Sequence, residues 1–145
     1  MPPNNTMPPI LRIHNFATGR VICHVMQDRP FILLGPPDCA TGLGAGWLGE
    51  LALALRTEFP QSRFEAMIDC ADHAGAALTA IDRGLEHILI RDISPQAHDR
   101  LVDLAGQNNI TIWNALPDDR PIHEIDNPFL PPDEMERRLR HLLTE

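Results

Sequence analysis

Residues 64–92, FEAMIDCADHAGAALTAIDRGLEHILIRD, decide the fold. The apolar run 64–70 predicts a strand, and the small-residue segment 74–83 that follows it predicts a helix. Gly84 comes directly after that segment, at the position where a helix commonly ends in a left-handed residue. A second apolar run, 85–91, predicts another strand. This order predicts two parallel strands joined by a right-handed crossover.

The same alternation extends in both directions from this unit. Upstream, the wholly apolar run 31–34 predicts a strand buried on both faces, and 47–59 predicts the helix after it. Downstream, Ser94 is a good N-cap for a helix over 95–107, which has proline at its first position. Residues 110–114 predict a further strand. Four strands linked by helices indicate an α/β domain with a parallel sheet.

The N-terminal part predicts a β-hairpin in front of these strands. Runs 10–16 and 20–26 alternate apolar and polar residues, and residues 17–19, Ala-Thr-Gly, suit a short connection between them. We therefore expect a short, mostly parallel sheet with helices on its faces, either flavodoxin/Rossmann-like or half-barrel-like. This α/β domain is expected to span 10–116, after a disordered tail at 1–9 that is rich in proline and asparagine.

Residues 117–145 predict a Pro-rich arm that ends in an amphipathic helix. The helix over 133–143 has Met135, Leu139 and Leu142 on one side, so it could pack on its own domain or on a second subunit. We find no catalytic signature in the chain. One hypothesis is therefore a regulatory or accessory role, through a homo-oligomer formed by the arm or through a protein partner.

Composition narrows the class of function. The net charge is −8, and all twelve basic residues are arginine, so lysine-dependent chemistry is excluded. An acidic chain argues against nucleic-acid binding, and no apolar run is long enough to predict a membrane span. The three cysteines, Cys23, Cys39 and Cys70, form no CxxC pair and predict reduced thiols. Reduced thiols and the lack of a recognisable signal peptide predict a cytoplasmic protein. We expect no cofactor.

The stretch 64–92 also resembles one βα unit and the next strand of (β/α)-barrel or doubly wound proteins. Its order of strand, Asp, small-residue helix, Gly, strand and Asp is similar to that in many phosphate-binding barrel enzymes. The resemblance covers about a fifth of the chain, which is too short for an eight-unit barrel. It implies the fold class and not an activity.

A candidate ligand site follows from topology, because ligands of open parallel sheets lie beyond the carboxyl ends of the strands. Arg91 is the cation at a strand end and could pair with a carboxylate or phosphate, although Asp69 or Asp92 could hold it instead. Asp72 and Ser94 are better explained as helix caps. The site would take a small anionic metabolite. The candidate binding residues are Asp38, Gly44, Gly46, Asp69, Arg91, Asp92 and Asn114.

Residues 44–49, GAGWLG, match the dinucleotide-binding pattern G-x-G-x-x-G, with Asp69 at the distance of a ribose-binding carboxylate. However, residues 36–43, which include two prolines, separate these glycines from the preceding strand. The spacing therefore disfavours a dinucleotide. Two alternatives stay open: the segment binds an anion at a helix start, or its glycines serve tight turns and close packing.

Residues 69–73, Asp-Cys-Ala-Asp-His, contain several side chains that can bind metals. Structural zinc needs a second ligand pair at defined spacing, and the other histidines are scattered, so we expect no metal. A nucleophilic Cys70 or Cys39 with His73 as base would need a lowered thiol pKa. The alternatives are buried, unreactive thiols, or redox or metal sensing by two cysteines at one edge of the sheet.

Overall fold

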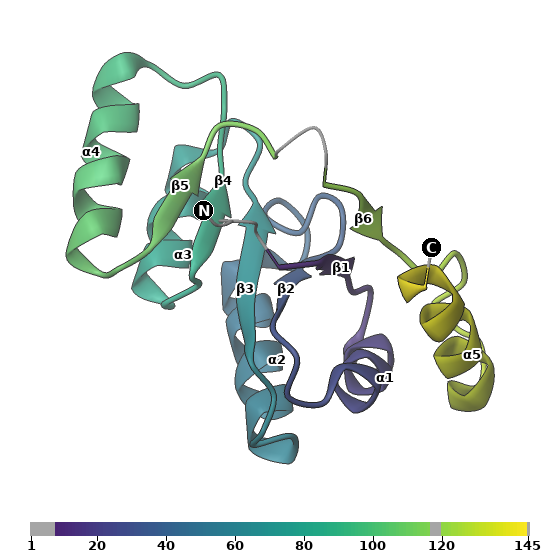
Figure 1. The fold of residues 1–145 in the computed structure, drawn as a ribbon. Coiled ribbons are helices and arrows are strands. Elements are labelled where there is room, and N and C mark those ends of the chain that lie inside the picture. Colours follow the sequence, from purple (N-terminus) through teal and green to yellow (C-terminus); the bar gives the residue numbers. More distant parts are fainter. Residues whose placement is uncertain (1–7, 117–119, 145) are drawn as a thin grey trace, which may run out of the picture.

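A six-stranded parallel sheet runs through the computed structural model, which describes residues 8–116 and 120–144 (Figure 1). The strands are β1 (Ile10–Arg12), β2 (Phe31–Leu34), β3 (Phe64–Asp69), β4 (His87–Leu89), β5 (Thr111–Trp113) and β6 (Ile122–His123). The helices are α1 (Phe16–Met26), α2 (Gly44–Glu58), α3 (Ala74–Asp82), α4 (Pro95–Gln107) and α5 (Pro132–Leu143). The expected α/β class with a parallel sheet is confirmed, with six strands in this part of the chain.

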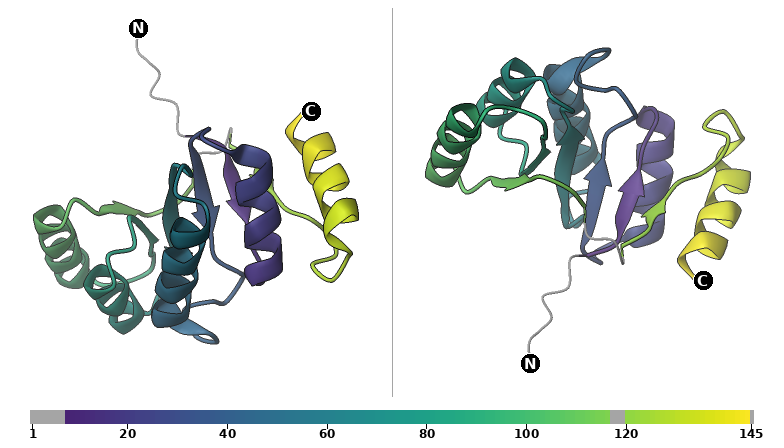
Figure 2. Two further views of the ribbon diagram at one scale, coloured as in Figure 1. Left: turned by 90° about the horizontal axis from the view of Figure 1, so that it is seen from below. Right: turned by 90° about the horizontal axis from the view of Figure 1, so that it is seen from above.

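The strands lie in the order β5-β4-β3-β2-β1-β6, and every neighbouring pair is parallel. From β1 to β5 the chain moves one position at a time in one direction. Right-handed crossovers that all move in one direction place their helices on one face of the sheet. Figure 2 shows this arrangement, with the helices on one side and the strands open on the other. The winding is therefore half-barrel-like, because a doubly wound sheet carries helices on both faces.

The predicted N-terminal hairpin is wrong. Its second arm is α1, and β1 pairs with β2 in parallel. Asn15 begins the helix with a capping box: its Oδ1 accepts from the Thr18 amide at 2.8 Å, while Thr18 Oγ1 accepts from the Asn15 amide at 3.2 Å. Gly19 lies inside α1, where an added Cβ would be 2.9 Å from Leu55 Cδ1. This glycine therefore allows close packing of α1 on α2 instead of forming a turn.

Two of the predicted caps have different outcomes. Ser94 caps α4 as predicted, accepting from the Ala97 amide at 3.1 Å. Asp72 does not cap α3, because the helix begins one residue later with His73 at the N-cap, and no side chain caps it. Gly84 follows the end of α3 and has a φ of +75°, which is the left-handed conformation predicted for this position.

The core is divided by the sheet into two layers, because alternate strand residues face opposite sides. The helix-covered side holds the larger layer, which includes Leu11, Leu33, Ala66, Ile68 and Ile88 from the strands. The open side holds a small buried layer of Ile10, Ile32, Leu34 and Met67, with Trp113, Leu116 and Ile122 packed against it.

The C-terminal segment adds to the same sheet and helical layer. Its strand β6 pairs in parallel with β1, with Ile122 opposite Ile10. Helix α5 packs on α1 and buries Met135 and Leu139. Its apolar side thus lies on its own domain, one of the two arrangements the sequence left open. Most of the tail expected at 1–9, and part of the arm at 117–119, lie outside the described residues. Each helix in the described ranges is too short or too polar to cross a bilayer.

Candidate functional site

A polar cavity of about 130 Å³ opens beyond the carboxyl ends of β2, β3 and β4. It is enclosed by the three loops that lead from these strands to α2, α3 and α4. Three of the predicted site residues, Asp38, Asp69 and Arg91, come together here. The complete lining is Asp38, Ala40, Thr41, Asp69, Cys70, Ala71, His73 and Arg91.

Asp69 and Arg91 form an ion pair in the cavity wall. Arg91 donates through Nη1 to Asp69 Oδ1 at 3.2 Å and through Nη2 to Oδ2 at 3.5 Å. Asp69 Oδ1 also accepts from the Ala71 amide at 2.9 Å. Both side chains are partly exposed. A solvent-accessible pair with these long distances contributes little to stability, so Arg91 can exchange Asp69 for another anion at small cost.

The three loops share an unusual backbone feature. Each contains a non-glycine residue with positive φ: Asp38 at 59°, Ala71 at 52° and Asp92 at 61°. Aspartate tolerates this conformation better than alanine does. Ala71 is held in it from both sides, since its amide binds Asp69 and its carbonyl accepts from the Arg91 amide at 2.8 Å. Such strain is commonly concentrated at functional sites.

The amino end of α3 borders the cavity. His73 occupies its N-cap, no side chain caps it, and its first turn contains no acidic residue. An open hollow along this turn shares Ala40, Thr41 and His73 with the cavity and continues to Gly75 and Thr79. Its lining also includes the carboxylate of Asp72, which lies 3.5 Å from His73 Nε2. The free amides and the dipole of a helix amino end favour an anion.

The other predicted site residues lie outside the cavity lining. Gly44 has φ +91° and forms the turn into α2, while an added Cβ at Gly46 would lie 3.3 Å from Arg83 Nη2. This geometry favours the alternative in which these glycines serve a turn and close packing, and anion binding at this segment stays a prediction. Asp92 and Asn114 are exposed, after β4 and β5 respectively.

The cysteines at this edge are poor nucleophiles. Cys39 and Cys70 are both fully buried. Burial raises the pKa of the Cys70 thiol to about 12, with further contributions from Asp69 and Cys39. Burial also raises the pKa of Cys39, against a small opposing effect of its hydrogen bond to Gly44. Redox-sensing and catalytic cysteines need an accessible thiol of lowered pKa, so this geometry argues against both roles.

The topological rule predicts His73 at this edge, with possible roles as a base or a metal ligand, but the sequence did not single out Thr41. Thr41 lies in a loop that follows a parallel strand, so the same rule would also have included it. Across the described ranges, no group of three or more His, Cys, Asp and Glu residues could hold a metal ion.

A second polar cluster at the same edge joins β6 to β1 and β2. Arg12 donates through Nη1 to the Gly35 carbonyl at 2.9 Å, and its Nε lies 3.5 Å from Glu124 Oε1. His14 Nε2 lies 2.7 Å from Glu124 Oε2. The Arg12 side chain is only 15% exposed. The contacts of Glu124 with Arg12 and His14 are ion pairs by distance that link β6 to β1, but Arg12 Nε and His14 Nε2 are buried without a hydrogen-bond partner among the described residues. The sequence could not reveal this cluster without the position of β6.

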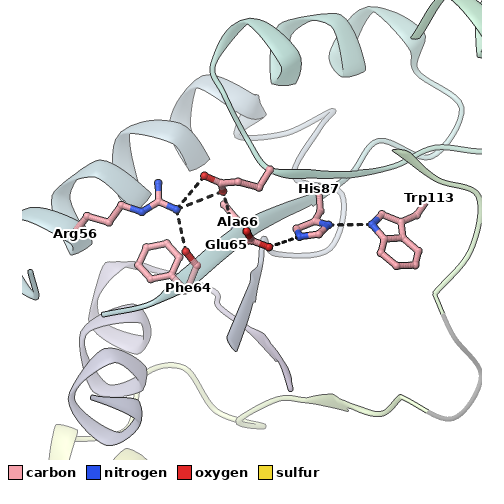
Figure 3. Close-up of polar contacts among 7 residues, drawn as sticks. Arg56, Phe64, Glu65, Ala66, His87 and Trp113 are labelled. Atoms are coloured by element: carbon pink, nitrogen blue, oxygen red, sulfur yellow. Dashed lines mark hydrogen bonds and ion pairs between the residues drawn. The ribbon is translucent and has the colours of Figure 1, made fainter. Parts of the chain in front are cut away.

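A third polar group lies on the open face of the sheet (Figure 3). His87 Nε2 is 2.7 Å from Glu65 Oε1, and the indole nitrogen of Trp113 donates to His87 Nδ1 at 3.0 Å. An indole N–H can only donate, so Nδ1 accepts and Nε2 carries the proton that is given to Glu65. This group satisfies its own hydrogen bonds and has the character of a structural network.

No known family model matches this sequence, and no curated protein matches it either. The fold and the geometry of the cavity therefore guide the functional argument. They define an α/β domain with a small polar cavity at the carboxyl edge of a parallel sheet.

Proposed function

We propose that this protein binds a small metabolite that carries a carboxylate or phosphate together with hydroxyl or amino groups. One observation supports this proposal above all: Arg91 and the uncapped amino end of α3 border the same cavity at the carboxyl edge of the sheet. Both favour an anionic group. The volume of about 130 Å³ is below the usual range of about 300–1,000 Å³ for ligand pockets, so the cavity limits the ligand to a small molecule.

The carboxylates of Asp38 and Asp69 in the cavity favour hydrogen-bond donors on the part of the ligand that is not anionic. Asp69 is engaged by Arg91 and by the Ala71 amide. Asp38 is exposed at the rim and presents an acceptor to the cavity. A carboxylate there repels a simple anion but accepts hydrogen bonds from hydroxyl or amino groups. The site thus favours a ligand with an anionic end and a hydrogen-bond-donating end, such as a hydroxy acid or a sugar phosphate.

Calorimetric titration of the full chain tests the proposal with three probes: inorganic phosphate, a small hydroxy acid and a sugar phosphate. The wild type should bind a bifunctional probe more tightly than inorganic phosphate. Arg91→Gln should weaken binding about tenfold or more, the effect of losing one charged hydrogen-bond donor. Arg100→Gln, an exposed arginine on α4, is the matched control and should leave binding unchanged.

Asp69→Asn makes the test sharper. Asparagine can still accept from the Ala71 amide through its oxygen, but it no longer neutralises Arg91. The variant should therefore bind inorganic phosphate more tightly than the wild type does. Failure of all three probes to bind, or equal binding by wild type and Arg91→Gln, would contradict the proposal.

A further inference from the structure

The loop between β6 and α5 presents a phenylalanine to solvent. Phe129 is 84% exposed, the highest value among the exposed large hydrophobic residues of the described chain. Its backbone is nevertheless fixed: the Phe129 amide donates to Asn127 Oδ1 at 3.0 Å, and Asn15 Nδ2 donates to the Pro128 carbonyl at 3.3 Å. The next residue, Leu130, packs against the core. A large apolar ring held outward on an ordered loop suits a protein contact, because little conformational entropy is lost on binding.

The helical layer contains an apolar pocket of about 340 Å³ beside this loop. It lies along α1, between the end of α2 and the start of α5, and its apolar walls include Ala17, Val21, Phe59 and Pro132. An apolar cavity of about 150 Å³ already holds a benzene molecule, so a phenyl ring fits. Figure 1 shows α1 and α5 side by side at this end of the sheet.

The charges around the pocket are already paired. Arg20 binds Glu58 through two nitrogens, with the shortest contact at 2.7 Å. Glu136 is bound by Arg140 at 2.9 Å and lies 3.7 Å from His24 Nε2. An entering charged group would have to compete with these partners, whereas an apolar group would not. The pocket therefore favours an uncharged, apolar occupant.

We propose that two copies of this chain form a dimer in which Phe129 of each copy occupies the α1–α5 pocket of the other. Pro132 lines the pocket only three residues after Phe129, so the projecting ring and the pocket adjoin on one molecule. A two-fold dimer needs this self-complementary arrangement, because each copy gives and receives the same contact. Phe16, 39% exposed, follows Asn15, which binds this loop, and extends the apolar surface.

Sedimentation velocity of the full chain over a wide range of concentration tests this proposal. The wild type should show a concentration-dependent monomer–dimer equilibrium. Phe129→Ala should raise the dimer dissociation constant about 30-fold or more, the effect expected of a central aromatic anchor. Ala17→Trp, which fills the pocket from an exposed position, should do the same without removing Phe129.

Val102→Ala provides the matched control, because it shortens an exposed apolar side chain on α4. It should leave the dissociation constant unchanged. Circular dichroism of each variant shows whether the fold is kept. A wild type that stays monomeric, or a dimer that tolerates both Phe129→Ala and Ala17→Trp, would overturn the proposal. The result does not depend on ligand binding at the carboxyl edge, because none of these positions lines that cavity.

Discussion

The two faces of the sheet bury their strand side chains in different ways. On the helix-covered face, strand residues such as Leu33, Ala66 and Ile68 are apolar and pack against the helices. On the open face, Leu34 and Met67 form the centre of a small apolar layer. The polar side chains of Glu65 and His87 lie on the same face. Glu65 and His87 are directly adjacent to strand residues that face the helices. The open face accepts these polar groups because they bind one another.

This difference shows what a second layer of structure contributes. Helices supply apolar partners for the central strand residues on their side, so polar groups there would be buried without hydrogen bonds. On the open face of the described chain no helix covers the strands, and the His87 network keeps its partners within hydrogen-bonding distance. On the open face, polar strand residues such as Glu65 and His87 are tolerated because residues of neighbouring strands supply their hydrogen-bond partners.

The reactivity of the buried thiols tests how completely the helix-covered face excludes water. Of the changes predicted here, we expect the change in thiol labelling rate to be the largest. Burial raises the pKa of Cys23 and of Cys70 from 9.0 to about 12. The thiolate fraction at about pH 8 should then fall about a thousandfold, since each pKa unit is tenfold. Labelling by a disulfide reagent should be slower by this factor in the native protein than in denaturant. Rapid native labelling would show that the helical layer opens readily.

Truncation of two neighbouring leucines in β2 compares the faces directly. Leu33 faces the helices and Leu34 faces the open side, and both are fully buried. We expect Leu33→Ala to cost about 3–4 kcal/mol of unfolding free energy and Leu34→Ala about 2 kcal/mol. The smaller layer can relax around a cavity more easily. Urea denaturation measures both values, and equal losses would mean that the two layers are equally well packed.

The smallest effect is expected for the polar network on the open face. Trp113→Phe keeps an aromatic side chain but replaces the indole with a smaller ring and removes the N–H that donates to His87 Nδ1. Beyond the cost of the smaller ring, the lost hydrogen bond should cost about 1 kcal/mol. Trp47→Phe on α2 is the control, measured by the same urea titration. A Trp113→Phe protein as stable as wild type would show that this bond adds nothing to the open face.

Much of the fold could be predicted from local pattern. The strand–helix rhythm from Phe31 to Trp113 was correct, as were the Ser94 cap and the left-handed Gly84. The hairpin prediction is wrong because Val21, Ile22 and Val25 fit a helix as well as a strand, and the capping box of Asn15 and Thr18 begins a helix there. At the candidate site, topology brings Asp38, Asp69 and Arg91 together, whereas Gly44 and Gly46 of the glycine motif lie outside the cavity lining.

The sequence by itself determined the elements from β2 to β5, the parallel class of the sheet and the edge where polar residues collect. These follow from period, caps and the handedness of crossovers, which are local properties of the chain. Only the tertiary structure decided that the helices share one face, that β6 joins β1, and that α5 packs on α1. It also decided which partners Arg91 and His87 have. Those features depend on contacts between residues far apart in the chain, which no local pattern specifies.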